Sequence, residues 1–157
     1  MAATPAVRVL EKARVVHTLH PYDPEHPADQ GHGEAAVAAL GADPHRVFKT
    51  LVARVDGTLT VAVVPVAGTL DLKALAAAVG GRKAAMAEPA DAERATGYVL
   101  GGISPLGQKK ALPTVVDDTA LGFATVMVSA GKRGLQLELP PQDLVALTRA
   151  RTAPIGR

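Results

Sequence analysis

The sequence predicts an α/β protein in which helices surround a mixed, strongly curved or barrel-like β-sheet. Two valine-rich runs flank an Asp-Gly pair, which is the pattern of a β-hairpin. Further strand-like runs alternate with short helical segments that proline and glycine delimit. The 157 residues are 48% apolar and contain no internal repeat or low-complexity linker. We therefore expect a single domain over residues 1–157.

The first half of the chain predicts two helices and three strands. Thr4 followed by proline predicts the start of a helix, and residues 15–20 predict a strand. The polar stretch 21–33 is too long and too broken for a hairpin turn, so we expect a loop there. The alanine-rich residues 34–40 predict a short helix. The hairpin strands follow, at 46–55 and 58–66 on either side of Asp56-Gly57.

The second half predicts three helices, one long loop and three strands. The helices are expected at 71–79, at 89–96 and from Pro140-Pro141 to about Arg149, because glycine or proline marks their ends. The loop spans 101–107, and the strands are expected at 114–117, 124–129 and 134–139.

Composition excludes several function classes. The chain has no cysteine, which rules out a disulfide scaffold, a Cys-ligated zinc site, an iron–sulfur cluster and a cysteine nucleophile. Aromatic residues make up 3%, too few for a platform of base-stacking rings. No apolar run approaches the roughly 18 residues of a membrane span, and the N-terminus lacks a basic-then-apolar signal. We therefore expect a cytoplasmic protein that does not enter a membrane.

Basic side chains occur in adjacent pairs, although the net charge is only +2. Lys109-Lys110 and Lys132-Arg133 lie in predicted loops, as does a third pair at 82–83. Paired cations in loops are candidates for contact with a phosphate backbone. The alternative is solvated loop charge.

The usual nucleophile and metal patterns are absent. Ser104 and Ser129 are the only serines, and Pro105 after Ser104 lacks the N–H of a nucleophile elbow. His26 and His32 lie in an acidic loop, but no ligand spacing supports a metal site. No phosphate-loop or dinucleotide fingerprint is present. We therefore expect neither a metal nor a cofactor.

Two features remain as site candidates. Lys49 interrupts an otherwise apolar strand, so its ammonium must reach solvent, pair with another group or hold an anion. It is either an edge-strand gatekeeper or a ligand for phosphate or carboxylate. The run Gly101-Gly102-Ile103-Ser104-Pro105 lets backbone approach a ligand closely, although such loops are often simple turns.

Read together, these segments resemble the YbaK/EbsC family of aminoacyl-tRNA deacylases, and most closely its Cys-tRNA(Pro) deacylases. The matching stretches run in family order across nearly the whole chain: residues 4–7, 47–51, 65–73, 96–110, 112–114 and 128–135. The longest of them reads Thr-Gly-Tyr-Val-Leu-Gly-Gly-Ile-Ser-Pro-Leu-Gly-Gln-Lys-Lys and is the most specific.

The resemblance implies a fold like the editing domain of prolyl-tRNA synthetase and a free-standing enzyme that removes cysteine from tRNA(Pro), and also from tRNA(Cys). It implies that Lys49 holds the 3′-terminal nucleotide and that the loop from Gly101 to Pro105 grips the aminoacyl ester. Thr50, Tyr22 and Ser129 would line the pocket. In this family the thiol of the bound cysteine attacks its own ester, so no protein nucleophile is needed. Prolyl-tRNA synthetase is the expected protein partner.

Two positions depart from the family pattern and bear on the choice of amino acid. His32 precedes Gly33 where the family has an aromatic residue, and Gln136 stands where this type often has aspartate. Both are expected in the substrate pocket. Two alternatives therefore stay open: a deacylase for another misacylated tRNA such as Ala-tRNA(Pro), which would use a bound water, and a non-catalytic tRNA- or synthetase-binding module.

Overall fold

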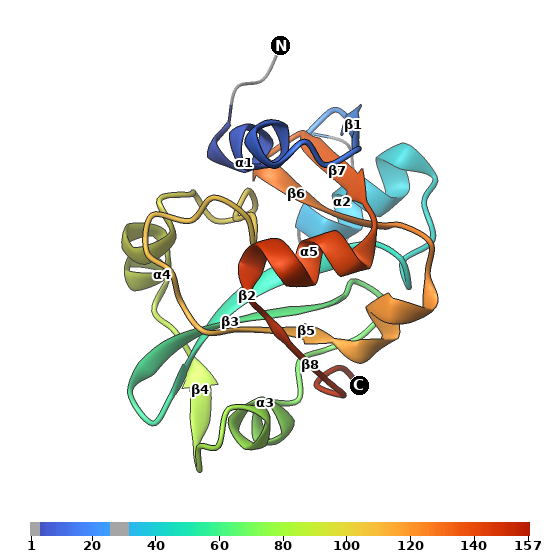
Figure 1. The fold of residues 1–157 in the computed structure, drawn as a ribbon. Helices are drawn as coiled ribbons and strands as arrows, with labels where there is room; N and C mark the ends of the chain where they lie inside the picture. The colour runs from blue at the N-terminus through green and yellow to red at the C-terminus, as the bar shows by residue number, and fades with distance from the viewer. Residues whose placement is uncertain (1–3, 26–31) are drawn as a thin grey trace.

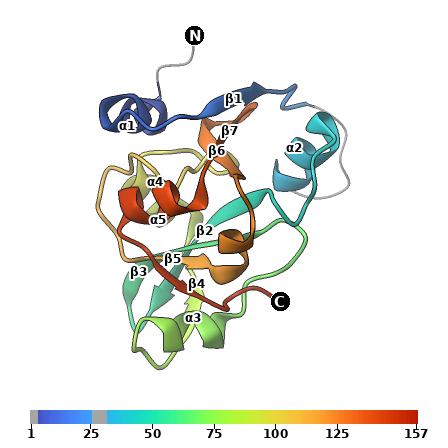
Figure 2. The same cartoon turned by 45° about the vertical axis from the view of Figure 1, so that its right-hand side comes forward.

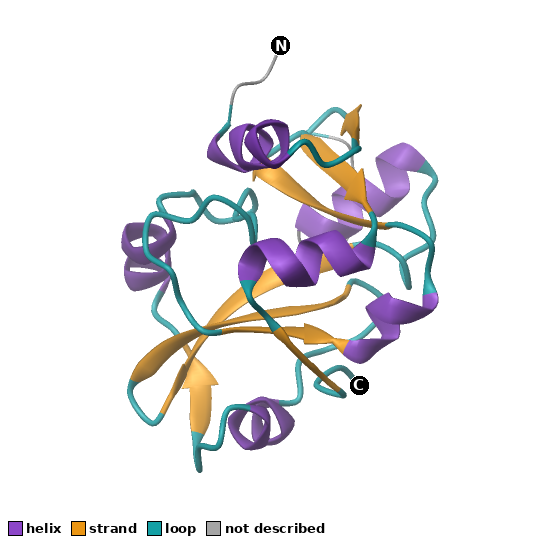
Figure 3. Ribbon diagram, viewed as in Figure 1, coloured by secondary structure: helices purple, strands orange, loops and turns teal. Residues whose placement is uncertain are grey.

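A computed structural model describes residues 4–25 and 32–157 of the chain. The elements are α1 (Pro5–Ala13), β1 (Thr18–Pro21), α2 (His32–Leu40), β2 (Phe48–Val55), β3 (Thr58–Pro65), α3 (Leu72–Ala78), β4 (Ala84–Met86), α4 (Pro89–Thr96), β5 (Thr114–Asp117), a 3₁₀ helix (Asp118–Gly122), β6 (Val126–Lys132), β7 (Leu135–Leu139), α5 (Pro141–Thr148) and β8 (Arg151–Ala153). Figures 1 and 3 show the helices around the strands. None of the described helices is long and apolar enough to cross a membrane.

Local sequence signals set most of these boundaries. The Thr4 hydroxyl accepts a hydrogen bond from the Val7 N–H at 3.2 Å, so it caps α1 as predicted. Asp56 and Gly57 have φ values of 49° and 86°, as a tight two-residue turn between β2 and β3 requires. The strand expected at 15–20 begins later, at Thr18, because the chain first leaves α1 through Arg14 in the left-handed conformation. Two three-residue strands, β4 and β8, were not predicted, since so short a run carries no periodic pattern.

The strands form two sheets. Five strands lie in the order β4-β2-β3-β5-β8 and three in the order β1-β7-β6. The larger sheet is mixed, as predicted, because β3, β5 and β8 run parallel while β2 is antiparallel to both of its neighbours. Among the described residues neither sheet closes on itself, so the barrel is not found, and the strong curvature stays a prediction. Figure 2 shows the small sheet above the large one.

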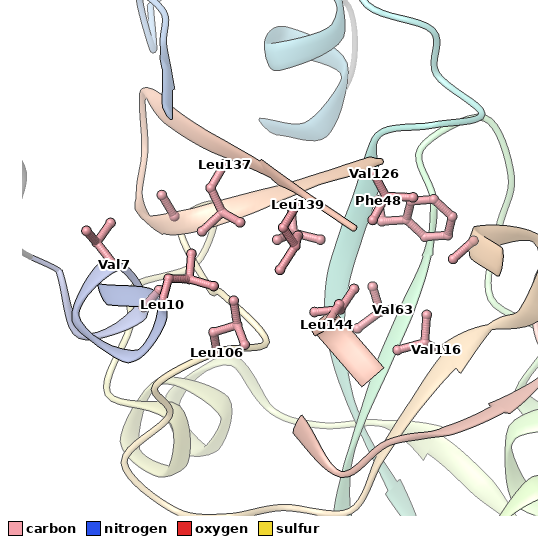
Figure 4. Packing of buried hydrophobic residues seen from close by; sticks show 14 of the residues in the cluster. Val7, Leu10, Phe48, Val63, Leu106, Val116, Val126, Leu137, Leu139 and Leu144 are labelled. Atoms are coloured by element: carbon pink, nitrogen blue, oxygen red, sulfur yellow. The ribbon is translucent and has the colours of Figure 1, made fainter. Parts of the chain in front are cut away.

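The main core lies between the two sheets. It joins Phe48 and Val63 from the large sheet with Leu137 and Leu139 from the small one, and α1, α5 and Leu106 close it at the sides (Figure 4). A second core covers the other face of the large sheet, where alternate residues of the same strands pack on α3. Both faces of β3 are therefore buried, which explains its nearly unbroken run of apolar residues.

A polar network also ties the two sheets together. The Glu138 carboxylate on β7 accepts hydrogen bonds from the Thr125 hydroxyl, from His20 Nε2 at 2.8 Å and from Arg46 Nη1 at 3.2 Å. These bonds, the Thr125 hydroxyl first, lower the pKa of Glu138 to about 2. Next to Arg46, Val47 forms a parallel bridge to Met127 of β6. The start of β2 is thus held against the small sheet.

Candidate active site

A cavity of about 390 Å³ opens beside the first half of β2, where the two sheets meet. Its lining comes from five separate parts of the chain: Gly33 and Glu34, residues 47–51, the segment Leu100, Gly101 and Ile103, Ser129 of β6, and Gln136 of β7. A volume of this size accommodates a small ligand such as an aminoacyl group.

The pocket follows the edge of β2 rather than one of its faces. Five consecutive residues of this segment line it, although successive side chains of a strand point in opposite directions. The reason is that β4 pairs with β2 only from Ala53 to Val55. Among the described strands, none covers this edge of β2 from Phe48 to Leu51.

Lys49 lies in this pocket with its ammonium already held. The half-buried side chain donates from Nζ to the carbonyl oxygen of Gly68 at 2.9 Å. That carbonyl belongs to a turn that the C-terminal residue fixes, since Thr69 and Arg157 exchange two backbone hydrogen bonds of 3.2 and 2.8 Å. Lys49 is therefore paired in the free protein, and the residue that holds its ammonium, Gly68, lies outside this cavity's lining.

Two residues that line the cavity, Thr50 and Gln136, each carry a buried side-chain oxygen for which the described residues supply no hydrogen-bond partner. These atoms are the Thr50 hydroxyl oxygen and Gln136 Oε1. Gln136 as a whole is 6% exposed. A buried polar atom without a partner costs on the order of 1–3 kcal/mol, so such atoms are rare in folded proteins. Both residues line the same cavity, which makes them candidates for contact with a bound substrate.

The glycine loop reaches the cavity through Gly101 and Ile103. Gly101 has a φ of 85°, a left-handed conformation that favours glycine. Gly102 faces away from the cavity and packs on the β6–β7 turn, where an added Cβ would lie 2.9 Å from the backbone of Lys132 and Arg133. The loop is fixed again at Tyr98, whose hydroxyl donates to the Leu106 carbonyl at 2.6 Å.

The remaining loop residues are buried outside the cavity lining. Ser104 is completely buried, and its hydroxyl oxygen accepts the Leu106 N–H at 3.2 Å. Pro105 is buried beside it. Ser129 does line the cavity, and its hydroxyl oxygen accepts the Gly131 N–H at 3.1 Å. Neither serine has a histidine partner among the described side chains, so the geometry contains no Ser-His pair of a hydrolase.

The other predicted residues lie around this site. Tyr22 is half-buried, and its backbone N–H donates to the Gly134 carbonyl, but its side chain is not part of the lining. His32 begins α2, and its side chain lies outside the described residues, as does His26. Lys132 and Arg133 are exposed on the turn that packs against Gly102. The other predicted pair of cations, Lys109-Lys110, is exposed beside the C-terminal end of α4, where the Lys109 backbone N–H donates to the Thr96 carbonyl oxygen.

The sequence did not single out Glu34 and Leu100 as lining residues, because nothing in their local pattern marks them. It also did not indicate a second cavity of about 490 Å³ at the opposite end of β2. That cavity lies between the β2–β3 turn, the end of α3 and Arg149, and it contains none of the predicted site residues.

Comparisons with known proteins identify relatives of this chain. The sequence profile of the aminoacyl-tRNA editing domain matches residues 29–147. The chain is 40% identical over 153 residues to EbsC of Enterococcus faecalis, a proposed Cys-tRNA(Pro)/Cys-tRNA(Cys) deacylase, and the match covers 97% of this chain and 92% of that protein.

Solved structures show the same fold. A proposed trans-editing enzyme for prolyl-tRNA synthetase superposes with a TM-score of 0.81 at 26% identity, over 100% of this chain and 99% of the other. The hypothetical protein APE2540 gives a TM-score of 0.84 at 23% identity, over 98% and 99% of the two chains, which is a likeness in fold. The profile covers most of the chain and EbsC matches nearly all of it, so the chain belongs to the aminoacyl-tRNA editing domain family of deacylases.

Proposed function

We propose that this deacylase acts in trans, as a free-standing single domain over residues 1–157, on tRNA(Pro) that carries cysteine, and also on Cys-tRNA(Cys). One observation carries the proposal: one cavity is lined by residues that are far apart in the chain, namely Lys49, Thr50, Gly101, Ser129 and Gln136. The name of EbsC, 40% identical to this chain, supports the choice of substrate.

Each part of the lining suits one part of the substrate. The Lys49 ammonium would bind the 3′-terminal adenosine, whose phosphate and ribose oxygens accept hydrogen bonds. Backbone next to Gly101 would approach the ester, since no side chain intervenes there. Thr50 Oγ1 and Gln136 Oε1 would face the amino acid and accept from its ammonium or thiol. Ser129 closes this end of the pocket.

The roles of the other predicted residues are also proposals, and we expect these residues to support the site. Gly102, Ser104 and Pro105 are buried next to Gly101, which supports a role in holding the loop rather than contact with the ester. We propose Tyr22 and His32 as further contacts for the substrate. We propose the exposed cations Lys109, Lys110, Lys132 and Arg133 as contacts for the tRNA backbone.

Ester cleavage in this pocket needs no protein nucleophile. The sulfur of the bound cysteine forms a bond to its own ester carbonyl carbon, and the bond from that carbon to the ribose oxygen breaks. The thiol proton ends on the departing ribose oxygen, so the products are a cyclic thioester and tRNA with a free hydroxyl. Holding thiol and ester together in a fixed geometry accelerates such a step by orders of magnitude. The backbone N–H groups of Gly101 and Ile103, the loop residues that line the cavity together with Leu100, would stabilise the negative charge that develops on the carbonyl oxygen.

A panel of charged tRNAs tests the proposal. Purified protein is incubated with Cys-tRNA(Pro), Cys-tRNA(Cys), Ala-tRNA(Pro), Pro-tRNA(Pro) and S-methylcysteinyl-tRNA(Pro), and released amino acid is measured. We expect both cysteine esters to be cleaved and the S-methyl ester, which has no free thiol, to persist. Cleavage of the alanine and S-methyl esters would instead indicate a bound water as nucleophile. Release from none of the substrates would leave a binding module and refute the proposal.

We further propose that the enzyme works in complex with prolyl-tRNA synthetase. A cavity of about 390 Å³ holds only the aminoacyl end of the tRNA, so selection of tRNA(Pro) needs contacts elsewhere. We also propose a cytoplasmic location, because charged tRNA is used in translation there. Co-elution of the two proteins with tRNA(Pro) in size-exclusion chromatography tests the complex, and separate elution at micromolar concentration contradicts it.

A further inference from the structure

We infer that Val99, Leu100 and Arg133 form a binding surface for the two unpaired nucleotides that precede the 3′-terminal adenosine of tRNA. These three residues are called the rim surface below. The inference rests on the proposed function, because it takes the terminal adenosine to occupy the cavity beside Lys49. It adds the direction in which the RNA leaves that cavity.

The rim surface presents apolar side chains to solvent on a loop that is fixed in place. Val99 is 56% exposed and Leu100 is 37% exposed, and Leu100 also lines the cavity. The Leu100 N–H donates to the Glu93 carboxylate at 2.9 Å, and its carbonyl accepts from Arg133 Nε at 2.8 Å. The Val99 carbonyl accepts the Gly102 N–H at 2.9 Å. These three hydrogen bonds hold the backbone of the loop in place. The Val99 and Leu100 side chains therefore stay exposed to solvent beside the pocket.

The charges around the mouth are unequal. The β6–β7 turn brings Lys132 and Arg133 to the side of Leu100, and both side chains are exposed. The lining also includes one acidic residue, Glu34, on α2. A phosphate backbone is attracted to the two cations and repelled by this carboxylate. Glu93 reduces the positive charge near Leu100 but is engaged by the backbone N–H.

A single-stranded nucleotide combines the two properties that this surface offers. Its unstacked base has an apolar face, and its phosphate carries a negative charge. Val99 and Leu100 can pack on base faces, and the part of the Arg133 guanidinium that does not bond Leu100 can bind phosphate. Paired bases in a duplex do not expose such faces, so the acceptor stem itself cannot use this surface.

Binding of uncharged RNA tests the inference without any catalytic step. An acceptor-stem hairpin that ends in CCA is compared with one that ends in a single A after the stem, using fluorescence anisotropy. We expect the wild-type protein to bind the CCA hairpin roughly tenfold more tightly. The double variant Val99→Ser, Leu100→Ser should bind both hairpins equally. Leu121→Ser, which changes a 45% exposed leucine outside the cavity lining, is the matched control and should keep the preference.

Equal binding of the two hairpins by the wild-type protein would overturn the inference, as would a preference that survives in the double variant. A loss of affinity for both hairpins alike would mark the loop as part of the pocket and would also overturn it. In kinetics, the single variant Val99→Ser, which changes a residue outside the cavity lining, should raise KM for aminoacyl-tRNA severalfold and leave cleavage of 3′-aminoacyl-adenosine unchanged. A defect that arises only with prolyl-tRNA synthetase present would identify a protein-docking surface instead. If the wild-type protein cleaves neither Cys-tRNA(Pro) nor Cys-tRNA(Cys), the proposed function is refuted. The comparison of the two hairpins measures binding alone, so it still decides this inference.

Discussion

Replacing Lys49 by methionine removes one positive charge from the cavity and keeps an unbranched side chain of similar length. The structure shows what this charge does in the free protein, where Nζ donates to the Gly68 carbonyl oxygen at 2.9 Å. From the sequence, an unpaired lysine on an apolar strand predicts unchanged or increased stability after its removal. The structure corrects that prediction, because the ammonium has a partner. We expect Lys49→Met to lower the free energy of unfolding by about 1 kcal/mol.

The effect on catalysis should be larger. An ammonium and a phosphate 4 Å apart attract each other by about 4 kcal/mol at an effective dielectric constant of 20. Lys49 must give up its bond to Gly68 to reach the substrate, which offsets about 1 kcal/mol of this gain. The remainder of about 3 kcal/mol corresponds to a rate loss of roughly a hundredfold. Lys49→Arg should restore only part of it, since a planar guanidinium does not replace a compact ammonium.

Single-turnover deacylation of Cys-tRNA(Pro) and urea unfolding, measured on the same preparations, separate the two effects. Lys73→Met is the matched control, because Lys73 is exposed on α3 and outside the cavity lining. It should change neither the rate nor the stability. Full activity of Lys49→Met would show that Lys49 is a structural edge lysine. A rate that falls only in proportion to the unfolded fraction would refute the reasoning in the same way.

Three further predictions concern the loop, the buried serine and the network between the sheets. Gly101→Ala should reduce the single-turnover rate at least tenfold. Gly57→Ala, which imposes the same left-handed strain at φ 86°, should lower only the melting temperature. If Gly101→Ala cleaves as fast as the wild-type protein, the loop is not part of the site. Ser104→Ala should change the rate by less than about threefold, and a loss on the order of 10⁴ would indicate a serine nucleophile. The folded-state pKa of Glu138, about 2, lies below its ordinary value of 4.5, so its stabilisation is complete above pH 4.5 and is lost as the pH falls toward 2. Urea titrations should show that the free energy of unfolding of the wild-type protein falls by about 1 kcal/mol more than that of Glu138→Gln over this pH interval. If the two free energies change in parallel with pH, the role of the network is contradicted.

Local patterns were sufficient for most of the secondary structure. The Asp56-Gly57 turn, the Thr4 cap and the glycines after α3 and α4 specify conformation within a few residues, and the structure has each of them where the sequence predicts it. Strands β4 and β8 were missed because three residues pair only when a neighbouring strand is already in place.

The sequence by itself determined the family of the protein and named several residues that line its candidate site. Lys49 and Gly101 stand out in the sequence itself, as a charge on an apolar strand and as a glycine in a glycine–proline loop. Thr50, Ser129 and Gln136 come from the resemblance to the family. The fold brings these five positions to one cavity, and their roles there stay predictions.

Only the tertiary structure decided how those residues are partnered. The Gly68 carbonyl that binds Lys49 is nineteen residues away from it in the sequence, and Arg133 is thirty-three residues away from Leu100, whose carbonyl it binds. The pocket itself exists because β4 leaves half of the β2 edge unpaired. Contacts between distant segments decide hydrogen-bond partners, unsatisfied atoms and strand edges. The periodicity of one segment does not specify which other segment packs against it.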